Sequence, residues 1–171
     1  MTDAFDAVEL HVSDATLQTY LSSSRPIPAI PTDDGAYLQR LDPATRATLE
    51  DYAGFGDAPD DVELGPIPRE IARSVTARAA IIGYRAARIA LGTDDKDQTW
   101  SRDEHDADAL LDEISSIDIG ALPYPATWSS AIVDDVITEA GYDPETQPLA
   151  SVASMAFDSG VMAALLEHDR M

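Results

Sequence analysis

Apolar and small residues recur at helical spacing over residues 68–91, the most regular stretch of the chain. One face repeats every three or four positions and consists of Ile71, Val75, Ala79, Ile82, Ala86 and Ile89. Pro68 suits the first turn of a helix, and Gly92 suits its end. The pattern therefore predicts one long helix. Alanines and Gly83 beside this face permit a neighbouring helix to approach closely.

A second amphipathic segment covers residues 101–118. Ser101 and Glu104 have the spacing of a capping box, in which each side chain bonds the backbone of the other. The apolar face of this segment is formed by Ala107, Leu110, Leu111, Ile114 and Ile117. Only a short acidic loop separates it from the first helix, so we expect the two helices to pack as an antiparallel pair.

Shorter helices are predicted on both sides of this pair. Their expected ranges are 13–24, 42–53, 129–140 and 148–166. Gly160 lowers the helix propensity of the last range by about 1 kcal/mol relative to alanine. Three prolines within residues 25–31 indicate an extended stretch, and residues 8–12 are compatible with a short strand.

These elements predict a mainly α fold. We expect a small helical bundle built on the antiparallel pair of residues 68–91 and 101–118, with extended loops. Residues 1–122 form the expected helical core, and residues 123–171 form a C-terminal helical extension. The segments 22–36 and 119–128 are expected to be flexible.

The chain is strongly acidic, with 32 Asp and Glu against 11 Lys and Arg and a net charge of -21. Such a surface repels phosphate, which argues against ordinary nucleic-acid or anionic-membrane binding. Dense carboxylates with a single lysine, Lys96, also favour a halophilic source, in which salt screens the repulsion. The absence of cysteine excludes disulfides and thiolate zinc sites. No apolar run reaches the roughly 20 residues of a membrane span.

Half of the ten arginines lie in the helix predicted at 68–91: Arg69, Arg73, Arg78, Arg85 and Arg88. One interpretation is a subunit contact, in which guanidinium groups pair with carboxylates of an adjacent copy. The other is helix pairing within the fold, against acidic residues of the second helix such as Asp108, Asp112 and Glu113. Both interpretations stay open. We expect Arg85 and Arg88 to contact carboxylates rather than DNA.

No motif for catalysis is present. The chain lacks the phosphate-binding loop G-x-x-x-x-G-K-[ST], the dinucleotide loop G-x-G-x-x-G and the nucleophile elbow G-x-S-x-G. His11, His105 and His168 are scattered and are interpreted as solvated surface residues. The acidic run 94–97 lacks the glycine and the final glutamate of an EF-hand. We therefore predict a protein that is not an enzyme and has no cofactor and no metal site.

Four short segments together resemble a known family. They are I-P-R-E-I-A-R at 67–73, I-G-Y-R at 82–85, H-D-A-D-A-L-L-D-E-I at 105–114 and G-A-L at 120–122. In this order they resemble the head–tail adaptor (connector, or head-completion) proteins of tailed viruses, including the Mu-like family. The resemblance covers about a third of the chain, and residues after 123 have no counterpart in it.

The resemblance implies a structural role. It implies a helical subunit that forms a ring of about twelve copies in the neck of a virion, between the portal protein and a tail or neck protein. Such a ring would seal the filled head and line a channel for double-stranded DNA. Its acidic lumen would repel the passing duplex, without specific binding. The composition would then point to a virus of a haloarchaeon. The alternative is a cytoplasmic helical accessory or regulatory protein of a halophile, without catalytic activity.

Overall fold

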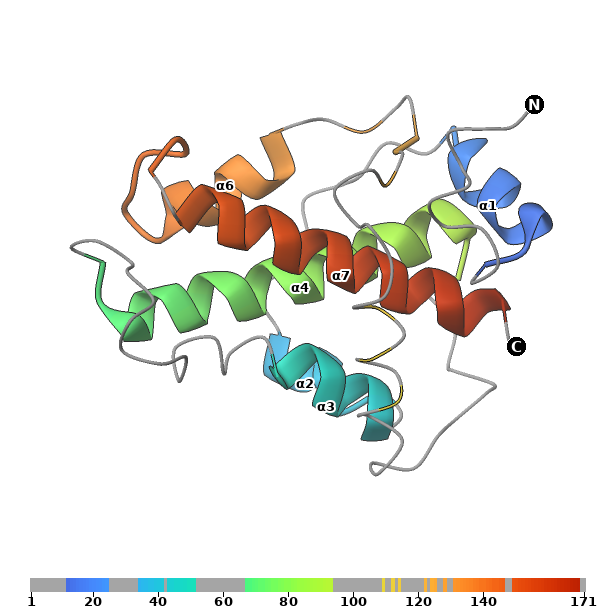
Figure 1. The fold of residues 1–171 in the computed structure, drawn as a ribbon, viewed down its shortest axis with the longest axis horizontal. Coiled ribbons are helices and arrows are strands. Elements are labelled where there is room, and N and C mark those ends of the chain that lie inside the picture. The colour runs from blue at the N-terminus through green and yellow to red at the C-terminus, as the bar shows by residue number, and fades with distance from the viewer. Residues whose placement is uncertain are drawn as a thin grey trace.

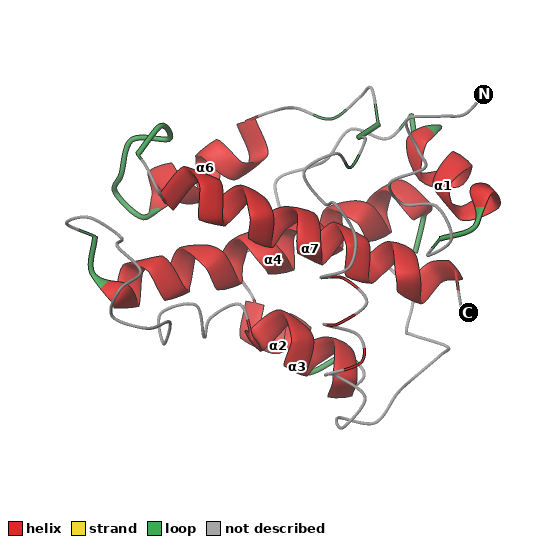
Figure 2. Ribbon diagram, in the orientation of Figure 1, coloured by secondary structure: helices red, strands yellow, loops and turns green. Residues whose placement is uncertain are grey.

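The computed structural model describes six stretches of the chain and seven single residues. The stretches are 12–24, 34–41, 43–51, 67–93, 131–146 and 149–169, and the single residues are Ala109, Asp112, Ile114, Leu122, Tyr124, Pro125 and Trp128. This part of the chain is mainly helical and contains no strand (Figure 2). The prediction of a mainly α bundle is therefore confirmed.

The long helix predicted from the apolar repeat is α4 (Arg69–Leu91). Pro68 precedes it in an extended conformation. Gly92 follows it with a φ of 79°, in the left-handed region where a side chain is strained. The backbone N–H groups of Gly92 and Thr93 donate to the carbonyls of Ile89 and Arg88 at 3.0 and 2.8 Å. Both predicted ends of this helix are therefore confirmed.

The main partner of α4 among the described elements is α7 (Leu149–Asp169). Figure 1 shows the two helices side by side and running in the same direction. A Cβ atom added to Gly83 would overlap the carbonyl oxygen of Phe157, and one added to Gly160 would overlap that of Ala80. The two backbones therefore touch at their crossing point. The small residues of α4 do permit a close neighbour, as predicted, and that neighbour is α7.

The predicted antiparallel partner, residues 101–118, lies outside the described residues except at three positions. Ala109, Asp112 and Ile114 are helical there, and Ile114 is buried in the core. The division into a core of residues 1–122 and an extension of residues 123–171 stays a prediction. The second half of α7, which belongs to residues 123–171, is buried against α4 in the hydrophobic core. The central packing of the described part is thus a parallel pair.

By length and composition alone, α7 could cross a membrane. Its most apolar stretch is interrupted too little by charge to exclude this, although 67% of that stretch is buried inside the protein. The absence of a membrane-spanning run therefore stays a prediction from the sequence. Packing against α4 accounts for the apolar character of the helix.

The N-terminus of α1 (Asp14–Leu21) is fixed to the end of α7. Ser13 caps the helix, since its hydroxyl accepts from the backbone N–H of Thr16 at 3.3 Å. The backbone N–H of Ser13 and the hydroxyl of Thr16 donate to one carboxylate oxygen of Asp169, at 3.0 and 3.1 Å. A carboxylate at the positive end of a helix is stabilising. Asp169 therefore holds α1 against the C-terminal end of α7.

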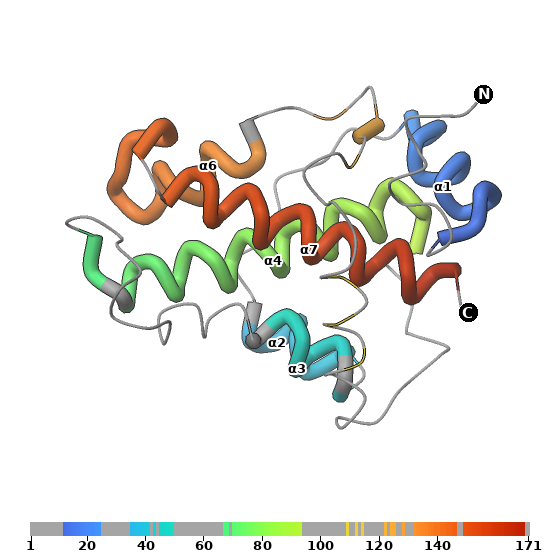
Figure 3. The backbone as a smooth tube through the Cα atoms, viewed as in Figure 1, coloured from blue at the N-terminus to red at the C-terminus, as the bar shows by residue number. Residues whose placement is uncertain are grey.

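Three shorter helices complete the described part: α2 (Asp34–Leu38), α3 (Pro43–Asp51) and α6 (Ala131–Glu139). In Figure 3, α6 lies on one side of the central pair, and α2 and α3 lie on the other. The ranges of α3, α6 and α7 agree with the predictions to within a few residues, and Gly141 follows α6 with a φ of 92°. The predicted cap Asp42, the proline-rich stretch 25–31 and the strand at 8–12 (except Val12) lie outside the described residues.

The sequence did not predict α2. Its first three residues fall at the end of the segment 22–36 that we expect to be flexible. Yet Tyr37 is 1% exposed and belongs to the hydrophobic core. A single helical turn is too short to display an apolar period, so a tertiary contact is what fixes it.

Candidate functional site

The arginines of α4 become more buried toward its C-terminal end. Arg73 and Arg78 are half-buried, whereas Arg85 and Arg88 are only 8% and 3% exposed. The side chain of Arg69 lies outside the described residues. Because burying a guanidinium is costly without partners, the two inner arginines must be compensated inside the fold.

Arg88 joins three parts of the molecule. Its Nε lies 4.0 Å from Oε1 of Glu167 in α7. One terminal nitrogen donates to the hydroxyl of Tyr37 in α2 at 3.2 Å, and the other donates to the carbonyl of Thr93 at 2.7 Å. Burial alone would lower the pKa of Arg88, but the surrounding Tyr84, Tyr37 and Glu167 raise it above its ordinary value. The guanidinium therefore stays charged in the interior.

Tyr84 and Glu167 form the second buried contact of this network. The hydroxyl of Tyr84 is 2.8 Å from each carboxylate oxygen of Glu167, so its proton is shared between the two. Burial, and then the negative charge of Glu167, raise the pKa of Tyr84 well above its ordinary value. Tyr84 therefore remains a hydrogen-bond donor across the whole neutral range.

Aromatic faces provide the remaining contacts. The guanidinium carbon of Arg85 lies 4.1 Å from the ring centroid of Tyr37, and that of Arg88 lies 5.6 Å from the ring centroid of Tyr84. The two tyrosine rings meet edge to face at 6.3 Å. Cation–π contacts strengthen when water is excluded from them. We call Tyr37, Tyr84, Arg85, Arg88 and Glu167 the arginine–tyrosine network; it joins α2, α4 and α7.

The observed contacts of the arginines agree only in part with the predicted ones. Arg88 contacts a carboxylate, as predicted, but that carboxylate is Glu167 of α7. Arg85 lies over Tyr37 and is buried within one subunit, so it is not exposed for a neighbouring copy. The expected acidic partners Asp108 and Glu113 lie outside the described residues, and Asp112 is exposed.

The sequence also did not predict the polar contacts at the C-terminal end of α7. No motif marks Glu167 or Asp169 in the sequence, and His168 between them is predicted to be a solvated surface residue. In the structure Glu167 is 4% exposed, and His168 is half-buried with its Nδ1 3.4 Å from the hydroxyl of Thr16. The signal that was available is periodicity, because Glu167 is one helical turn from the apolar residues Ala163 and Ala164.

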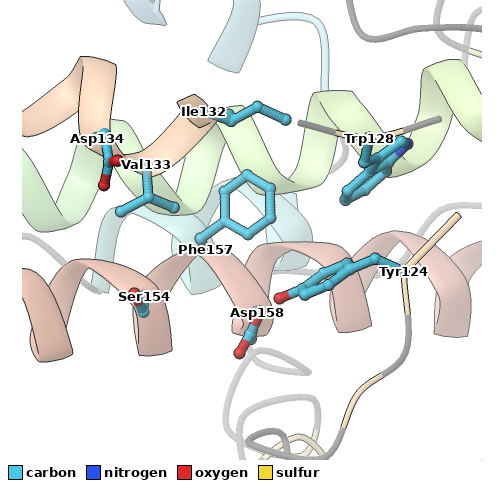
Figure 4. A pocket seen from close by; sticks show the side chains of 8 residues that line it. All are labelled: Tyr124, Trp128, Ile132, Val133, Asp134, Ser154, Phe157 and Asp158. Carbon is cyan, nitrogen blue, oxygen red and sulfur yellow. The ribbon is translucent and has the colours of Figure 1, made fainter. Parts of the chain in front are cut away.

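A second candidate site is a cavity between α6, α7 and the segment that precedes α6 (Figure 4). Its volume is about 350 Å³. It is lined by Tyr124, Trp128, Ile132, Val133, Asp134, Ser154, Phe157 and Asp158. We call it the aromatic pocket. The volume lies at the lower end of the range typical of small-ligand sites.

Three aromatic rings form one wall of this pocket. Tyr124 and Trp128 are stacked, with centroids 5.3 Å apart and planes inclined by 25°. Phe157 meets Trp128 nearly at right angles, at 6.0 Å. From behind, Tyr20 of α1 contacts Trp128 edge to face at 5.6 Å. We call Tyr124, Trp128 and Phe157 the aromatic wall, and Tyr20 supports it from the interior.

Asp158 is the polar group beside this wall. Figure 4 shows the hydroxyl end of Tyr124 directed toward it. Burial raises the pKa of Asp158 from 3.8 to about 7. Burial raises the pKa of Tyr20, and the negative charge of Asp158 raises it further. Asp158 therefore exchanges a proton near neutral pH, and a cation placed beside it would favour its charged form.

The aromatic pocket is not predicted from the sequence. Asp158 is one of 32 acidic residues and stands in an apolar helix without a distinguishing motif. Tyr124 and Trp128 belong to the segment 119–128, which the sequence predicts only to be flexible. Their approach to Phe157 depends on how α6 and α7 pack, which no short-range pattern encodes. In the part of the chain that the structure describes, no group of three or more His, Asp or Glu side chains could hold a metal ion.

Comparison with known proteins adds no relative. No protein-family model matches the chain, and the searches of curated proteins and of solved structures found no match.

Proposed function

We propose that the chain is a structural assembly protein, a head–tail adaptor that forms a ring between portal and tail in a virion. The proposal starts from the four segments of resemblance and from the acidic composition. The observation that carries it is where the residues behind the resemblance lie. Tyr84 stands at the centre of the arginine–tyrosine network, and Ile114 and Leu122 are buried in the same hydrophobic core as α4.

A rigid scaffold suits this role. The crossing of α4 and α7 allows no side chain between the backbones, and buried polar contacts fix how α2 sits on this pair. Buried networks of this kind can specify one packing arrangement among several. A subunit that must repeat identically around a ring needs a single arrangement, since each copy meets both neighbours through two different faces.

The inner arginines do not serve as the contact between copies in this proposal. Arg85 and Arg88 are enclosed in their own subunit, so the ring interface must be formed by the outer surface. A net charge of -21 per copy repels neighbouring copies when screening is weak. We therefore expect a monomer or weak oligomer for the isolated chain and a ring of about twelve copies, the number implied by the family resemblance, on its portal.

Particle imaging tests the proposal. The purified chain is mixed in molar salt with portal rings of the virus that encodes it, and the products are examined by electron microscopy and light scattering. An added ring on the portal is the expected result. A chain that stays monomeric and associates with neither portals nor tails would exclude the adaptor role. Genes for a portal and a major capsid protein beside the gene for this chain would support it independently.

A further inference from the structure

The carboxylate of Asp158 is incompletely satisfied. Its Oδ1 is buried and has no hydrogen-bond partner within the described residues. A buried acceptor without a donor costs free energy, and the cost is greater when the group is charged. Asp158 also lines the aromatic pocket, and rotation about the Cβ–Cγ bond of an aspartate is soft. Either oxygen can therefore turn toward a donor that enters the cavity.

The aromatic wall favours a planar cation as that donor. Stacked Tyr124 and Trp128, with Phe157 at their edge, present extended π surfaces to the same cavity as the carboxylate. A cation is attracted to the face of an aromatic ring and to a carboxylate at once. A second carboxylate, that of Asp134, lines the opposite end of the cavity in Figure 4.

The missing hydrogen bond decides between kinds of cation. A quaternary ammonium ion has no N–H group, so it would leave Oδ1 of Asp158 unsatisfied. A lysine ammonium group can donate, but it is compact and strongly hydrated. A guanidinium group is planar, stacks on aromatic rings and carries five N–H donors. The pocket therefore matches an arginine side chain best.

The rim of the pocket points to a protein as the source of that arginine. Among the described residues, the exposed large hydrophobic side chains are Tyr124, at 42%, and Met155, at 60%. Tyr124 lines the pocket itself, and Met155 follows the lining residue Ser154 in α7. Apolar surface beside a charged pocket accommodates the methylene stem of an arginine and the residues around it. Methionine and aromatic residues are also enriched at protein interfaces.

We infer that the aromatic pocket is a docking site for an arginine side chain of a partner protein. The guanidinium lies against the aromatic wall and donates to Asp158, while Tyr124 and Met155 contact the apolar part of the partner segment. The strongly negative chain attracts a basic segment from a distance. The inference holds for any partner that presents an arginine, so it does not depend on the adaptor role.

Titration with small probes tests the chemistry of the pocket. N-acetyl-arginine amide is the probe, and N-acetyl-citrulline amide, which has nearly the same shape but no charge, is its control. NMR shifts of the Trp128 indole and the Met155 methyl report binding to the full chain. The arginine probe is expected to saturate both signals and to bind at least tenfold more tightly than the citrulline probe, a difference of about 1.4 kcal/mol.

Two variants separate the pocket from the general acidity of the chain. Asp158→Asn keeps the shape and removes the charge, and it should weaken arginine binding at least tenfold. Asp135→Asn removes the same charge from an exposed position on α6 outside the pocket, and it should leave the affinity within about twofold. Tyr124→Ser, at a half-exposed site, should also weaken binding and provides a second variant with little risk to folding.

Three results at low salt would overturn the inference. They are equal affinity for the arginine and citrulline probes, equal loss in Asp158→Asn and Asp135→Asn, and the absence of saturable binding by the arginine probe. The titration is repeated in molar salt, where attraction by distant charges is screened. Binding that persists there and still requires Asp158 supports the pocket, whereas binding that disappears there in all variants assigns it to the acidic surface.

Discussion

Gly83 in α4 and Gly160 in α7 stand at the crossing of the two helices, and each leaves room for the backbone of the other. Helix propensity alone disfavours Gly160 within α7, since glycine lowers helix stability by about 1 kcal/mol relative to alanine. In the fold it is a requirement, because no side chain fits at that point.

Alanine at either crossing position should destabilise the protein strongly. In Gly83→Ala and Gly160→Ala the new methyl group meets backbone atoms of the facing helix, which cannot turn aside as a side chain can. We expect the free energy of unfolding to fall by about 3 kcal/mol or more, the upper part of the range for overpacking. Urea unfolding measured in molar salt checks this.

Gly35 in α2 is the matched control. A Cβ atom there meets nothing within 4 Å, and the position is exposed. Gly35→Ala should therefore leave stability unchanged or raise it by about 0.5–1 kcal/mol through better helix propensity. If all three alanine variants behave alike, the close approach of the two helices is not what holds the core.

Removing Arg88 should unfold the protein more readily than removing Arg40. Arg88→Ala leaves Glu167 buried without its cation and takes a donor from Tyr37, so we expect a loss of about 3–5 kcal/mol. Arg40 is exposed, and its guanidinium carbon lies 5.6 Å from the ring centroid of Tyr37, so Arg40→Ala should cost less than about 1 kcal/mol. Thermal and urea unfolding measure both.

A double variant distinguishes pairing from packing. If Arg88 and Glu167 compensate each other, replacing both by leucine should cost less than the sum of the two single replacements. Strict additivity would show that the two charges are stabilised by other groups. Glu139→Ala, at an exposed site on α6, should change stability by less than about 0.5 kcal/mol and serves as the reference.

The protonation of Asp158 should make stability depend on pH in a direction unusual for a carboxylate. Its pKa rises from 3.8 to about 7 on folding, so the folded state binds the proton more tightly. Relative to Asp158→Asn, the wild-type free energy of unfolding should fall as pH rises from about 4 to about 7 and level off above that. Urea unfolding of both proteins across this range measures the difference. Parallel curves would show that Asp158 ionises normally.

Low salt should destabilise the fold, because a net charge of -21 makes the folded chain repel itself when screening is weak. The screening length exceeds about 10 Å below 0.1 M salt and shrinks to about 3 Å at 1 M. We expect the melting temperature to fall sharply on dialysis from molar salt to low salt. Asp135→Asn combined with Glu139→Gln, both exposed on α6, should reduce that fall. A melting temperature independent of salt would show that the acidity is not a salt adaptation.

The sequence predicted what short-range rules control. The apolar period, Pro68 and Gly92 located α4 to within one residue, and Ser13 and Gly141 marked the limits of α1 and α6. It did not predict the choice of partner for α4. The acidic loop and opposite charges favoured the neighbouring segment 101–118, whereas among the described helices shape complementarity at Gly83 and Gly160 selects α7.

Neither candidate site could be predicted from the sequence, because each brings together residues that are far apart in the chain. The arginine–tyrosine network brings Tyr37, Arg88 and Glu167 together from three helices far apart in the chain. The aromatic pocket likewise needs the loop at Tyr124 to meet α7. Residue type marked the arginines as unusual but could not tell an interior network from a subunit contact, because both use the same carboxylate chemistry.

The parallel course of α4 and α7 also constrains how the chain folds. Antiparallel helices can join through a few residues and pack as soon as both exist, whereas Gly83 and Gly160 are roughly 75 residues apart. The entropy of closing that long loop must be overcome before either helix buries its small-residue face. The core therefore depends on contacts that are distant in sequence, and folding should be slower than in a helical bundle of the same size with neighbouring partners. Until α7 packs against α4, its apolar surface stays exposed to water and to other unfolded chains. Aggregation should therefore compete most strongly with the formation of this helix crossing.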